Sequence, residues 1–333
     1  MSATGPAAIK YGFYDRLKAE FPSQIIVDVT EICNLACTHC PHPEFKKSEY
    51  YSGAYLPEEL NTKVIDEVAG AGRGHTQYVR YTSEGEPLIH PKAFAMLRYA
   101  KERSGTTVTL TTNGTLLRPK QIDQLLETGI DLVDISIDAF LDETYKNIRV
   151  GGDLAVTRAH VLDLIRRRSA AGSKMKIVVS YIEQPNNAAQ TQDFQKFWKA
   201  QGADYVVIRQ LHSAAGAKGE VKETMLRGQS AIPRRPCVYP WERVLLQPSG
   251  FIFFCPADWN RGSSVVDYRT TTLQEIWRGE FYQKLRQAHL DNDFKAHPFC
   301  GQCPDWVLTG WPGQSRGYAD MVQDFQRADG EPI

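Results

Sequence analysis

Short apolar runs alternate with longer stretches of helical periodicity from about residue 24 to residue 211. The runs are rich in Val, Ile and Leu, which is typical of strands that are covered on both faces. They predict strands at Ile25–Thr30, Gln77–Tyr81, Thr107–Thr111, Leu132–Ile137, Lys176–Ser180 and Tyr205–Gln210. The periodic stretches predict helices at Pro57–Ala69, Pro91–Glu102, Pro119–Glu127, Val156–Ala171 and Thr191–Ala200.

This alternation of strands and helices predicts a parallel sheet with right-handed crossovers. Six such units suit an open, partial barrel better than a closed barrel of eight units. We therefore expect an α/β fold with a partial (β/α)6 barrel over residues 24–213, preceded by an N-terminal extension over residues 1–23. In such barrels the reactive groups lie on the loops that follow the carboxyl ends of the strands.

The pattern changes at about residue 214. Ala214–Gly219 is small and polar, and is predicted to be a linker or mobile loop. A hairpin is expected where Trp241–Gln247 and Phe251–Cys255 flank a glycine-containing turn. Leu273–Ala288 has the spacing of one amphipathic helix. Together with an aromatic tail that is expected to pack back onto the body, residues 214–333 are predicted to form a small α+β domain.

The charge of the chain is balanced, with 39 Lys and Arg residues against 39 Asp and Glu residues. Binding of nucleic acid by bulk attraction needs a basic excess, so this class of function is disfavoured. No apolar run approaches the roughly 18 residues that span a bilayer. The first ten residues also lack the apolar core of a secretion signal. We expect a cytoplasmic protein with a small-molecule substrate and with no nucleic-acid or membrane partner.

Three cysteines follow the first predicted strand within eight residues, at Cys33, Cys37 and Cys40. Thiolates ligate iron–sulfur clusters, and three of them on a four-iron cubane leave one iron open for another ligand. The alternatives are a zinc site or chance proximity. A structural zinc site usually takes a fourth nearby ligand, and His39 lies inside the loop where its reach is doubtful. The spacing therefore favours a cluster.

The other four cysteines form a second set in the C-terminal region, at Cys237, Cys255, Cys300 and Cys303. Four thiolates complete the ligation of one 4Fe–4S cubane or of one tetrahedral zinc ion. By spacing alone, zinc is slightly favoured. The two sets account for all seven cysteines of the chain.

The Cys-x3-Cys-x2-Cys loop after the first strand is identified as the signature of the radical SAM family. Ser83-Glu84-Gly85-Glu86-Pro87 resembles the family's Gly-Gly-Glu-Pro element, although Glu84 replaces the first glycine and a plain turn is the alternative reading. By this resemblance, the residues near SAM are His39, Gly85, Glu86, Pro87, Asn113, Ser136, Asp138, Ser180 and Arg209.

The C-terminal layout resembles the SPASM/twitch extension of radical SAM enzymes. A cysteine, a hairpin, a second cysteine, a helix and a Cys-x2-Cys pair follow in that order. Four cysteines fit the shorter twitch form, which holds one auxiliary cluster. The resemblance thus implies SAM, two 4Fe–4S clusters (one SAM-binding and one auxiliary), and a reductant such as flavodoxin or ferredoxin.

The reaction that the resemblance implies depends on whether a cysteine is left over beyond the two sets, and here none is. Radical epimerases of this family return a hydrogen atom to the substrate from a free cysteine, whereas a dehydrogenase needs an electron acceptor such as an auxiliary cluster. We therefore expect oxidation of an alcohol of a sugar- or aminocyclitol-like small molecule to a ketone. The expected catalytic residues are Glu84, Asp138, Tyr181 and Arg209, and weaker candidates for the proton acceptor are Glu183 and His212.

Three other functions stay open at this point. The first is radical epimerisation of a sugar or aminocyclitol. The second is modification of ribosomal peptides, although such enzymes usually carry a peptide-recognition domain and only about 23 residues precede the first predicted strand. The third, an electron-transfer or zinc-binding protein, would not cleave SAM.

Overall fold

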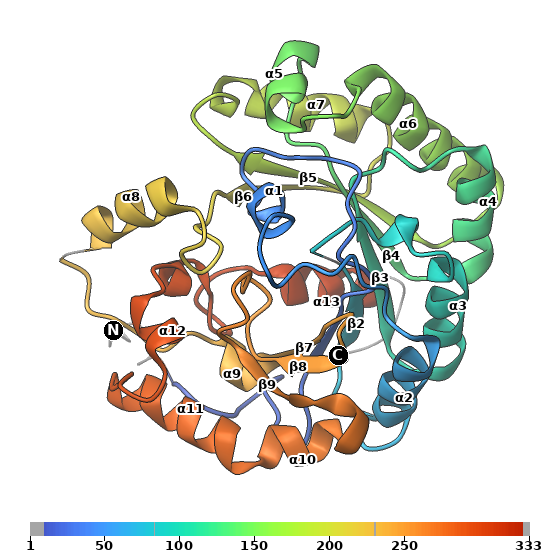
Figure 1. Cartoon of the computed structure of the whole chain (residues 1–333). Helices are drawn as coiled ribbons and strands as arrows, with labels where there is room; N and C mark the ends of the chain where they lie inside the picture. The colour runs from blue at the N-terminus through green and yellow to red at the C-terminus, as the bar shows by residue number, and fades with distance from the viewer. Residues whose placement is uncertain (1–9, 83, 230, 329–333) are drawn as a thin grey trace, which may run out of the picture.

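The structure is a computed structural model that describes residues 10–82, 84–229 and 231–328, so that Ser83 lies outside the described residues. Within these ranges one sheet of nine strands has the order β6-β5-β4-β3-β2-β1-β7-β8-β9 (Figure 1). The strands are β1 Gln24–Val27, β2 Tyr78–Tyr81, β3 Thr107–Thr112, β4 Leu132–Ser136, β5 Lys176–Glu183, β6 Tyr205–Gln210, β7 Arg243–Leu246, β8 Phe251–Phe253 and β9 Ser264–Asp267. Strands β1 to β6 are parallel to their neighbours, which confirms the expected parallel sheet.

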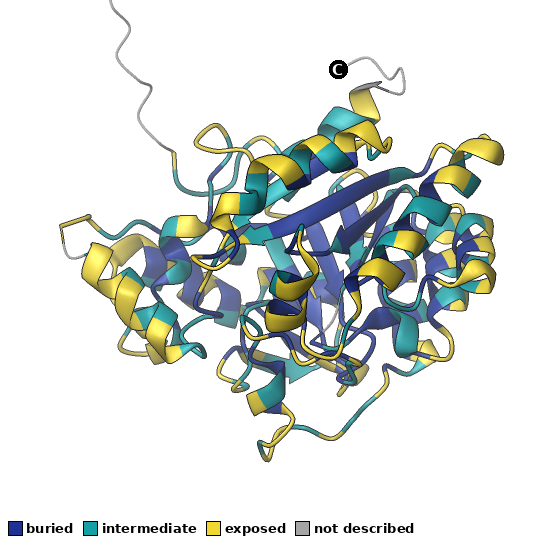
Figure 2. Cartoon of the chain, turned by 90° about the horizontal axis from the view of Figure 1, so that it is seen from above, coloured by how far each residue is buried: buried dark blue, intermediate teal, exposed yellow. Residues whose placement is uncertain are grey.

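Helices cover the outer face of the parallel part of the sheet. They are α2 Glu58–Ala69, α3 Ala93–Arg103, α4 Pro119–Thr128, α6 Leu154–Ala170 and α7 Thr191–Ala200. Apolar strand residues such as Val79, Leu110 and Val133 are fully buried in one core with helix residues such as Val64 and Ile122. Figure 2 shows the strands buried beneath helices whose outer faces are exposed. Each predicted strand and helix of this half is present, and its ends lie within three residues of the prediction.

The barrel stays open, and the C-terminal region continues its sheet. β7 pairs in parallel with β1, with Gln24 opposite Arg243 and Val27 opposite Leu246. β7 then pairs antiparallel with β8, and β8 with β9, which confirms the predicted hairpin. The sequence did not predict the β1–β7 pairing, because neither strand shows by its own pattern which edge it will join.

The predicted amphipathic helix Leu273–Ala288 is instead two helices, α10 Leu273–Arg278 and α11 Glu280–Asp291. They meet at Gly279, whose backbone is extended (φ −68°, ψ 164°). A Cβ at this position would lie 2.7 Å from the carbonyl oxygen of Glu275, so the chain approaches itself closely at the bend. The apolar spacing continues across the break, because both helices contribute to the same core, and this hid the break from the sequence pattern.

The C-terminal tail packs against the concave face of the sheet, as predicted. Helix α13 spans Tyr318–Ala328. Its Ala319 and Val322 pack against Tyr78 of β2, and its Met321 packs against β4 and β5. The helix therefore covers part of the inner face of the open barrel.

The predicted linker is anchored at its start. Asp305 accepts hydrogen bonds from Ser213 N, Ser213 Oγ and Ala215 N, at 2.7 to 2.8 Å. Ala214 and Ala215 have left-handed backbones, with φ of 53° and 52°. Helix α8, Gly219–Gln229, follows the linker and has no buried residue among those described.

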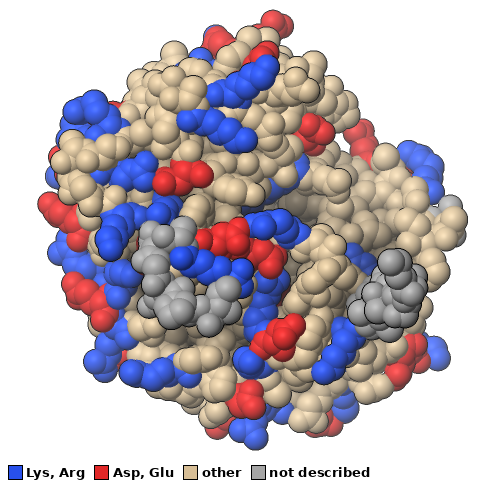
Figure 3. All heavy atoms as spheres, turned by 180° about the vertical axis from the view of Figure 1, so that it is seen from behind, with Lys and Arg blue, Asp and Glu red and all other residues tan. Residues whose placement is uncertain are grey.

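Basic and acidic side chains are interspersed on the face of the molecule that Figure 3 shows. No helix within the described ranges has the length and apolar character needed to cross a membrane.

Candidate active site

The three-cysteine loop follows β1 and is fixed by backbone hydrogen bonds to a distant segment. Ala36 N donates to Val150 O at 2.9 Å, and Thr38 N donates to Ile148 O at 3.0 Å. The segment that they join follows β4, where helix α5 spans Asp142–Ile148. The loop that brings Cys33, Cys37 and Cys40 together is therefore held on the barrel's carboxyl-end side.

The three thiols form a site that favours binding of a positively charged group. Burial, together with the negative charge of the neighbouring Cys37 thiolate, raises the pKa of Cys33 and of Cys40 to about 12. Burial also raises the pKa of Cys37, whose Sγ lies 3.7 Å from Arg149 Nη1. Thiolates at such a site are stable only when a cation offsets their mutual repulsion, and an iron–sulfur cluster does so. The donor set fits the expected SAM-binding cluster.

Asp138 connects the end of β4 to this loop. Its carboxylate is fully buried and accepts hydrogen bonds from Arg149 Nη2 and, at 2.7 Å, from Ile182 N. Arg149 in turn lies against Cys37. His39 Nε2 lies 3.6 Å from Asp138, and burial lowers the pKa of His39 to about 4, so its ring is neutral at pH 7. The geometry makes Asp138 a residue that positions the cysteine loop.

The segment after β2 lies directly against the cysteine loop. Glu86 N donates to Ile32 O at 2.8 Å, and a Cβ on Gly85 would lie only 2.2 Å from that same oxygen. Only glycine permits this approach. The Glu86 carboxylate accepts hydrogen bonds from Thr112 Oγ1 at 2.6 Å and from Asn113 N at 2.7 Å. Glu86 therefore sets the conformation of the loop after β3. Pro87 begins a short 3-10 turn directly after it.

Glu84 lies in a buried charged network between the barrel and the C-terminal region. Its carboxylate accepts hydrogen bonds from Gln247 at 3.1 Å and from Arg261 at 3.2 Å. Arg261 Nη2 also lies 2.9 Å from Glu31. Burial raises the pKa of Glu84 to about 7, and Arg261 opposes this shift.

The second cysteine set gathers at the other side of the open barrel. Cys237 precedes β7, Cys255 follows β8, and Cys300 and Cys303 lie in and after the short helix α12, Pro298–Gln302. Burial, and the charge of the other three thiols, raise the pKa of Cys255 well above its usual value. Among the residues that the structure describes, no three His, Cys, Asp or Glu side chains are arranged to hold a single metal ion.

Two polar side chains, Arg234 and His289, accompany these thiols. Arg234 donates to Cys300 O at 2.5 Å and to Gly301 O at 3.0 Å. It has no carboxylate partner within the described ranges, and its guanidinium lies 4.4 Å from the centre of the Phe294 ring. His289 accepts a hydrogen bond from Cys237 N at 3.4 Å. Four thiolates and an unpaired cation fit the expected all-cysteine cluster, whose net charge is negative.

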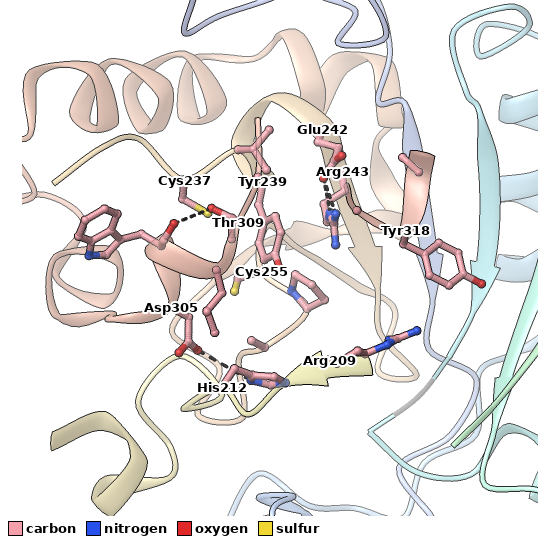
Figure 4. A pocket seen from close by; sticks show the side chains of 18 of the residues that line it. Arg209, His212, Cys237, Tyr239, Glu242, Arg243, Cys255, Asp305, Thr309 and Tyr318 are labelled. Atoms are coloured by element: carbon pink, nitrogen blue, oxygen red, sulfur yellow. Dashed lines mark hydrogen bonds and ion pairs between the residues drawn. The ribbon is translucent and has the colours of Figure 1, made fainter. Parts of the chain in front are cut away.

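A cavity of about 760 Å³ joins the four cysteines to the concave face of the barrel. Figure 4 shows Arg209 and Tyr318 at one end, with Cys237 and Cys255 toward the other and His212 beside Asp305. Of the four expected catalytic residues, Arg209 lines this cavity, whereas Glu84, Asp138 and Tyr181 do not.

The other predicted residues lie as follows. Tyr181 is fully buried in the core on the helix side, and its hydroxyl donates to Asn187 O at 2.6 Å. Ser180 lies opposite Ser136 in the β4–β5 register and donates a hydrogen bond to Asp134. Glu183 accepts a hydrogen bond from the Thr191 hydroxyl at 2.7 Å, at the end of β5.

Sequence reasoning missed several charged residues of the site. Arg80 and Asp134 lie on the concave face of the sheet. Each is a charged residue inside a short apolar strand, and this feature of the sequence could have identified both. Arg149, Arg234 and Arg261 could not be identified in this way, because each contacts a residue of the site that is far away in the sequence.

Comparison with known proteins agrees with this geometry. Residues 27–190 match the radical SAM superfamily, and residues 237–304 match the SPASM iron–sulfur cluster-binding domain. The AdoMet-dependent heme synthase of Methanosarcina barkeri is 36% identical over 128 residues, which are 38% of this chain and 34% of that protein. The chain spans about a third to a half of the length of the curated relatives that it matches.

Two solved structures share the fold over most of the chain. BtrN in complex with AdoMet and 2-DOIA has a TM-score of 0.59 and 15% identity, and the match covers 88% of this chain and 96% of BtrN. SuiB of Streptococcus suis bound to its precursor peptide SuiA has a TM-score of 0.62 and 14% identity, with 80% and 67% covered. At these identities, the likeness concerns the fold.

Proposed function

Because the chain carries a radical SAM domain followed by a SPASM domain, and so belongs to the radical SAM superfamily, we propose that it oxidises an alcohol of a sugar- or aminocyclitol-like small molecule to a ketone. One observation carries the proposal. All seven cysteines belong to the two sets, and the set of four lines the same cavity as Arg209. No cysteine is left over to return a hydrogen atom to the substrate.

When bound, SAM with its cluster supplies the radical that removes a hydrogen atom from the carbinol carbon, and the auxiliary cluster supplies an acceptor for the remaining electron. Cys33, Cys37 and Cys40 would hold the first cluster, and the Asp138–Arg149 pair keeps their loop in place. The other four cysteines would hold the second cluster at the wall of the substrate cavity. The oxidation also releases the hydroxyl proton, so that a hydrogen atom, an electron and a proton leave the substrate together.

Cleavage of each SAM takes one electron, and oxidation of the substrate radical would pass one electron to the auxiliary cluster, so the overall reaction consumes no net electron. An external donor would be needed to reduce the SAM-binding cluster at the start. We propose a flavodoxin or a ferredoxin as the donor. The chain also resembles the aminocyclitol dehydrogenase of butirosin biosynthesis. BtrN, which was solved with AdoMet and 2-DOIA, shares the fold at 15% identity.

The experiment begins with hydroxylated metabolites, screened for release of 5′-deoxyadenosine from the anaerobically reconstituted chain. The expected product is two mass units lighter than its substrate, with one SAM consumed for each product. The same turnover in deuterated water tests the alternative. An isomeric product with one solvent-derived deuterium would overturn the proposal in favour of an epimerase with a donor other than cysteine. Loss of two mass units from a peptide would indicate peptide modification instead.

A further inference from the structure

Two arginines on the concave face of the barrel share a single carboxylate. Arg209 Nη2 lies 2.5 Å from Asp134 Oδ2, and Arg80 Nη2 lies 3.5 Å from the same oxygen. Asp134 is fully buried, and its other oxygen accepts a hydrogen bond from Ser180. The three charges sum to one net positive charge, and both arginines line the cavity.

Three of the other arginines that line this cavity are balanced by a carboxylate. Arg16, Arg243 and Arg316 each form an ion pair of their own, with Asp320, Glu242 and Asp324. Arg234 has no carboxylate partner among the described residues, but it lies toward the other end of the cavity, beside the thiols of the auxiliary set. At the barrel end of the cavity, the excess charge therefore belongs to the Arg80–Arg209 pair.

The pair also has unused hydrogen-bond donors. Arg80 directs Nε and Nη2 to the Thr111 hydroxyl, at 3.0 and 2.9 Å. Its Nη1, and both Nε and Nη1 of Arg209, have no hydrogen-bond partner among the described residues. The Tyr318 ring lies 4.0 Å from the Arg80 guanidinium and 5.8 Å from that of Arg209, and it holds the two side chains from the α13 side.

A third donor lies further along the same wall. Ala214 N donates to His212 Nδ1 at 3.0 Å, so the neutral ring of His212 carries its proton on Nε2. Burial lowers the pKa of His212, which keeps the ring neutral at pH 7. His212 thus offers the cavity an N–H group and not a lone pair.

The acceptors on this wall are already in use. Asp305 accepts hydrogen bonds from the linker backbone, and Glu242 pairs with Arg243. At the barrel end of the cavity, a cationic amine would therefore meet the net positive charge of Arg80 and Arg209, whose one carboxylate is already shared. A neutral sugar would leave that charge unpaired in a partly buried place.

We propose that the substrate carries a carboxylate, and that Arg80 and Arg209 bind it. Arginine presents parallel N–H groups that match a carboxylate in geometry. One net positive charge matches the single charge of a carboxylate better than the larger charge of a phosphate. The inference rests on the proposed function in taking this cavity as the substrate site, and it narrows the substrate to a hydroxylated acid.

The test measures binding and needs no turnover. The full chain with both clusters is titrated with D-glucuronate, neutral D-glucose, cationic D-glucosamine and D-glucose 6-phosphate, and the shift of the thermal unfolding midpoint gives each affinity. Glucuronate should bind about tenfold more tightly than glucose, as expected for one charge-assisted contact. Arg209→Gln should abolish this preference. The matched control is Arg316→Gln, which removes a lining arginine that has its own partner and should keep the preference.

A second variant, which should tighten binding instead of weakening it, distinguishes loss of the binding site from misfolding. Asp134→Asn removes the shared negative charge with little change of shape, so it should tighten the binding of glucuronate. Misfolding cannot produce that result.

Several outcomes overturn the inference. They are equal or tighter binding of glucose or glucosamine than of glucuronate, tighter binding of glucose 6-phosphate than of glucuronate, and no binding of glucuronate. SAM also carries a carboxylate, so its affinity is measured by equilibrium dialysis. If Arg209→Gln weakens SAM and leaves glucuronate unchanged, the pair holds the cofactor instead. If the carboxylate preference is found but the product keeps the mass of its substrate, the proposed oxidation fails while this inference stands.

Discussion

Arg261 Nη1 lies 3.2 Å from Glu84 Oε1, so a residue between β8 and β9 pairs with a carboxylate on the loop after β2. The Glu84 carboxylate is nearly fully buried, and burial raises its pKa to about 7 in spite of this pair. The folded state therefore keeps a proton on Glu84 between about pH 4.5 and about 7, where the unfolded chain has released it.

The first prediction concerns the pH dependence of stability. A folded-state pKa above the unfolded value means that the free energy of unfolding falls as the pH rises through this interval, by on the order of 3 kcal/mol. Glu84→Gln should remove this fall, and urea unfolding at several pH values measures it. The control Glu58→Gln alters an exposed ion pair with Lys92 and should keep the fall. An unchanged pH dependence in Glu84→Gln would show that Glu84 does not titrate in this range.

The second prediction concerns the clusters. Anaerobically reconstituted chain should contain about eight irons and about eight sulfides, and replacing Cys33, Cys37 and Cys40 by Ala should leave about four of each. Cys37→Ala alone should abolish the reductive release of 5′-deoxyadenosine, because the open iron is lost. Metal analysis and chromatography of the nucleoside measure the two effects. About four irons together with bound zinc in the parent chain would reject the auxiliary cluster.

The third prediction concerns the reduction potential of the auxiliary cluster. Arg234 lies against the carbonyl oxygens of Cys300 and Gly301 without a carboxylate partner among the described residues, so its charge favours the reduced, more negative cluster. Arg234→Gln should therefore lower that potential in a redox titration followed by EPR. Arg235→Gln is the matched control, since Arg235 donates to Thr309 O and Val307 O and should leave the potential unchanged. Equal shifts in both variants would mean that the effect is general.

The fourth prediction concerns the close approach at Gly85. A Cβ there would lie 2.2 Å from Ile32 O, so Gly85→Ala must displace either the cysteine loop or the segment after β2. The free energy of unfolding should fall by about 2 kcal/mol, and SAM should bind at least about tenfold more weakly. Gly219→Ala in α8 meets nothing within 4 Å and should change neither quantity. Urea unfolding and equilibrium dialysis measure both, and unaltered SAM binding in Gly85→Ala would contradict the placement of this loop.

The strands and helices of the barrel could be predicted well from the sequence, because each of them is specified by residues that are close together in the chain. Each strand is an apolar run and each helix has its own period, so their presence follows from short windows of the chain. The two cysteine sets were also readable, because their spacing is itself the signal. The break at Gly279 was not readable, since the apolar spacing continues across it and only the close contact with Glu275 O reveals it.

The parts that escaped prediction depend on contacts between distant segments. Glu84 was expected to be catalytic from its position after β2, and its hydrogen bond with Arg261, which is 177 residues away in the chain, was not predicted. The carboxylate shared by Arg80 and Arg209 likewise requires β2, β4 and β6 to curve around one cavity. The periodicity of apolar residues specifies the helices and strands. Which charged side chains pair with one another depends instead on how the whole sheet curves.

The parallel pairing of β1 with β7 has a mechanical consequence. A backbone ladder crosses from the barrel into the C-terminal region, so the two cannot rotate about a hinge without breaking it. The separation between the two groups of thiols is then fixed once the chain folds, and electron transfer between them would not wait for domain closure.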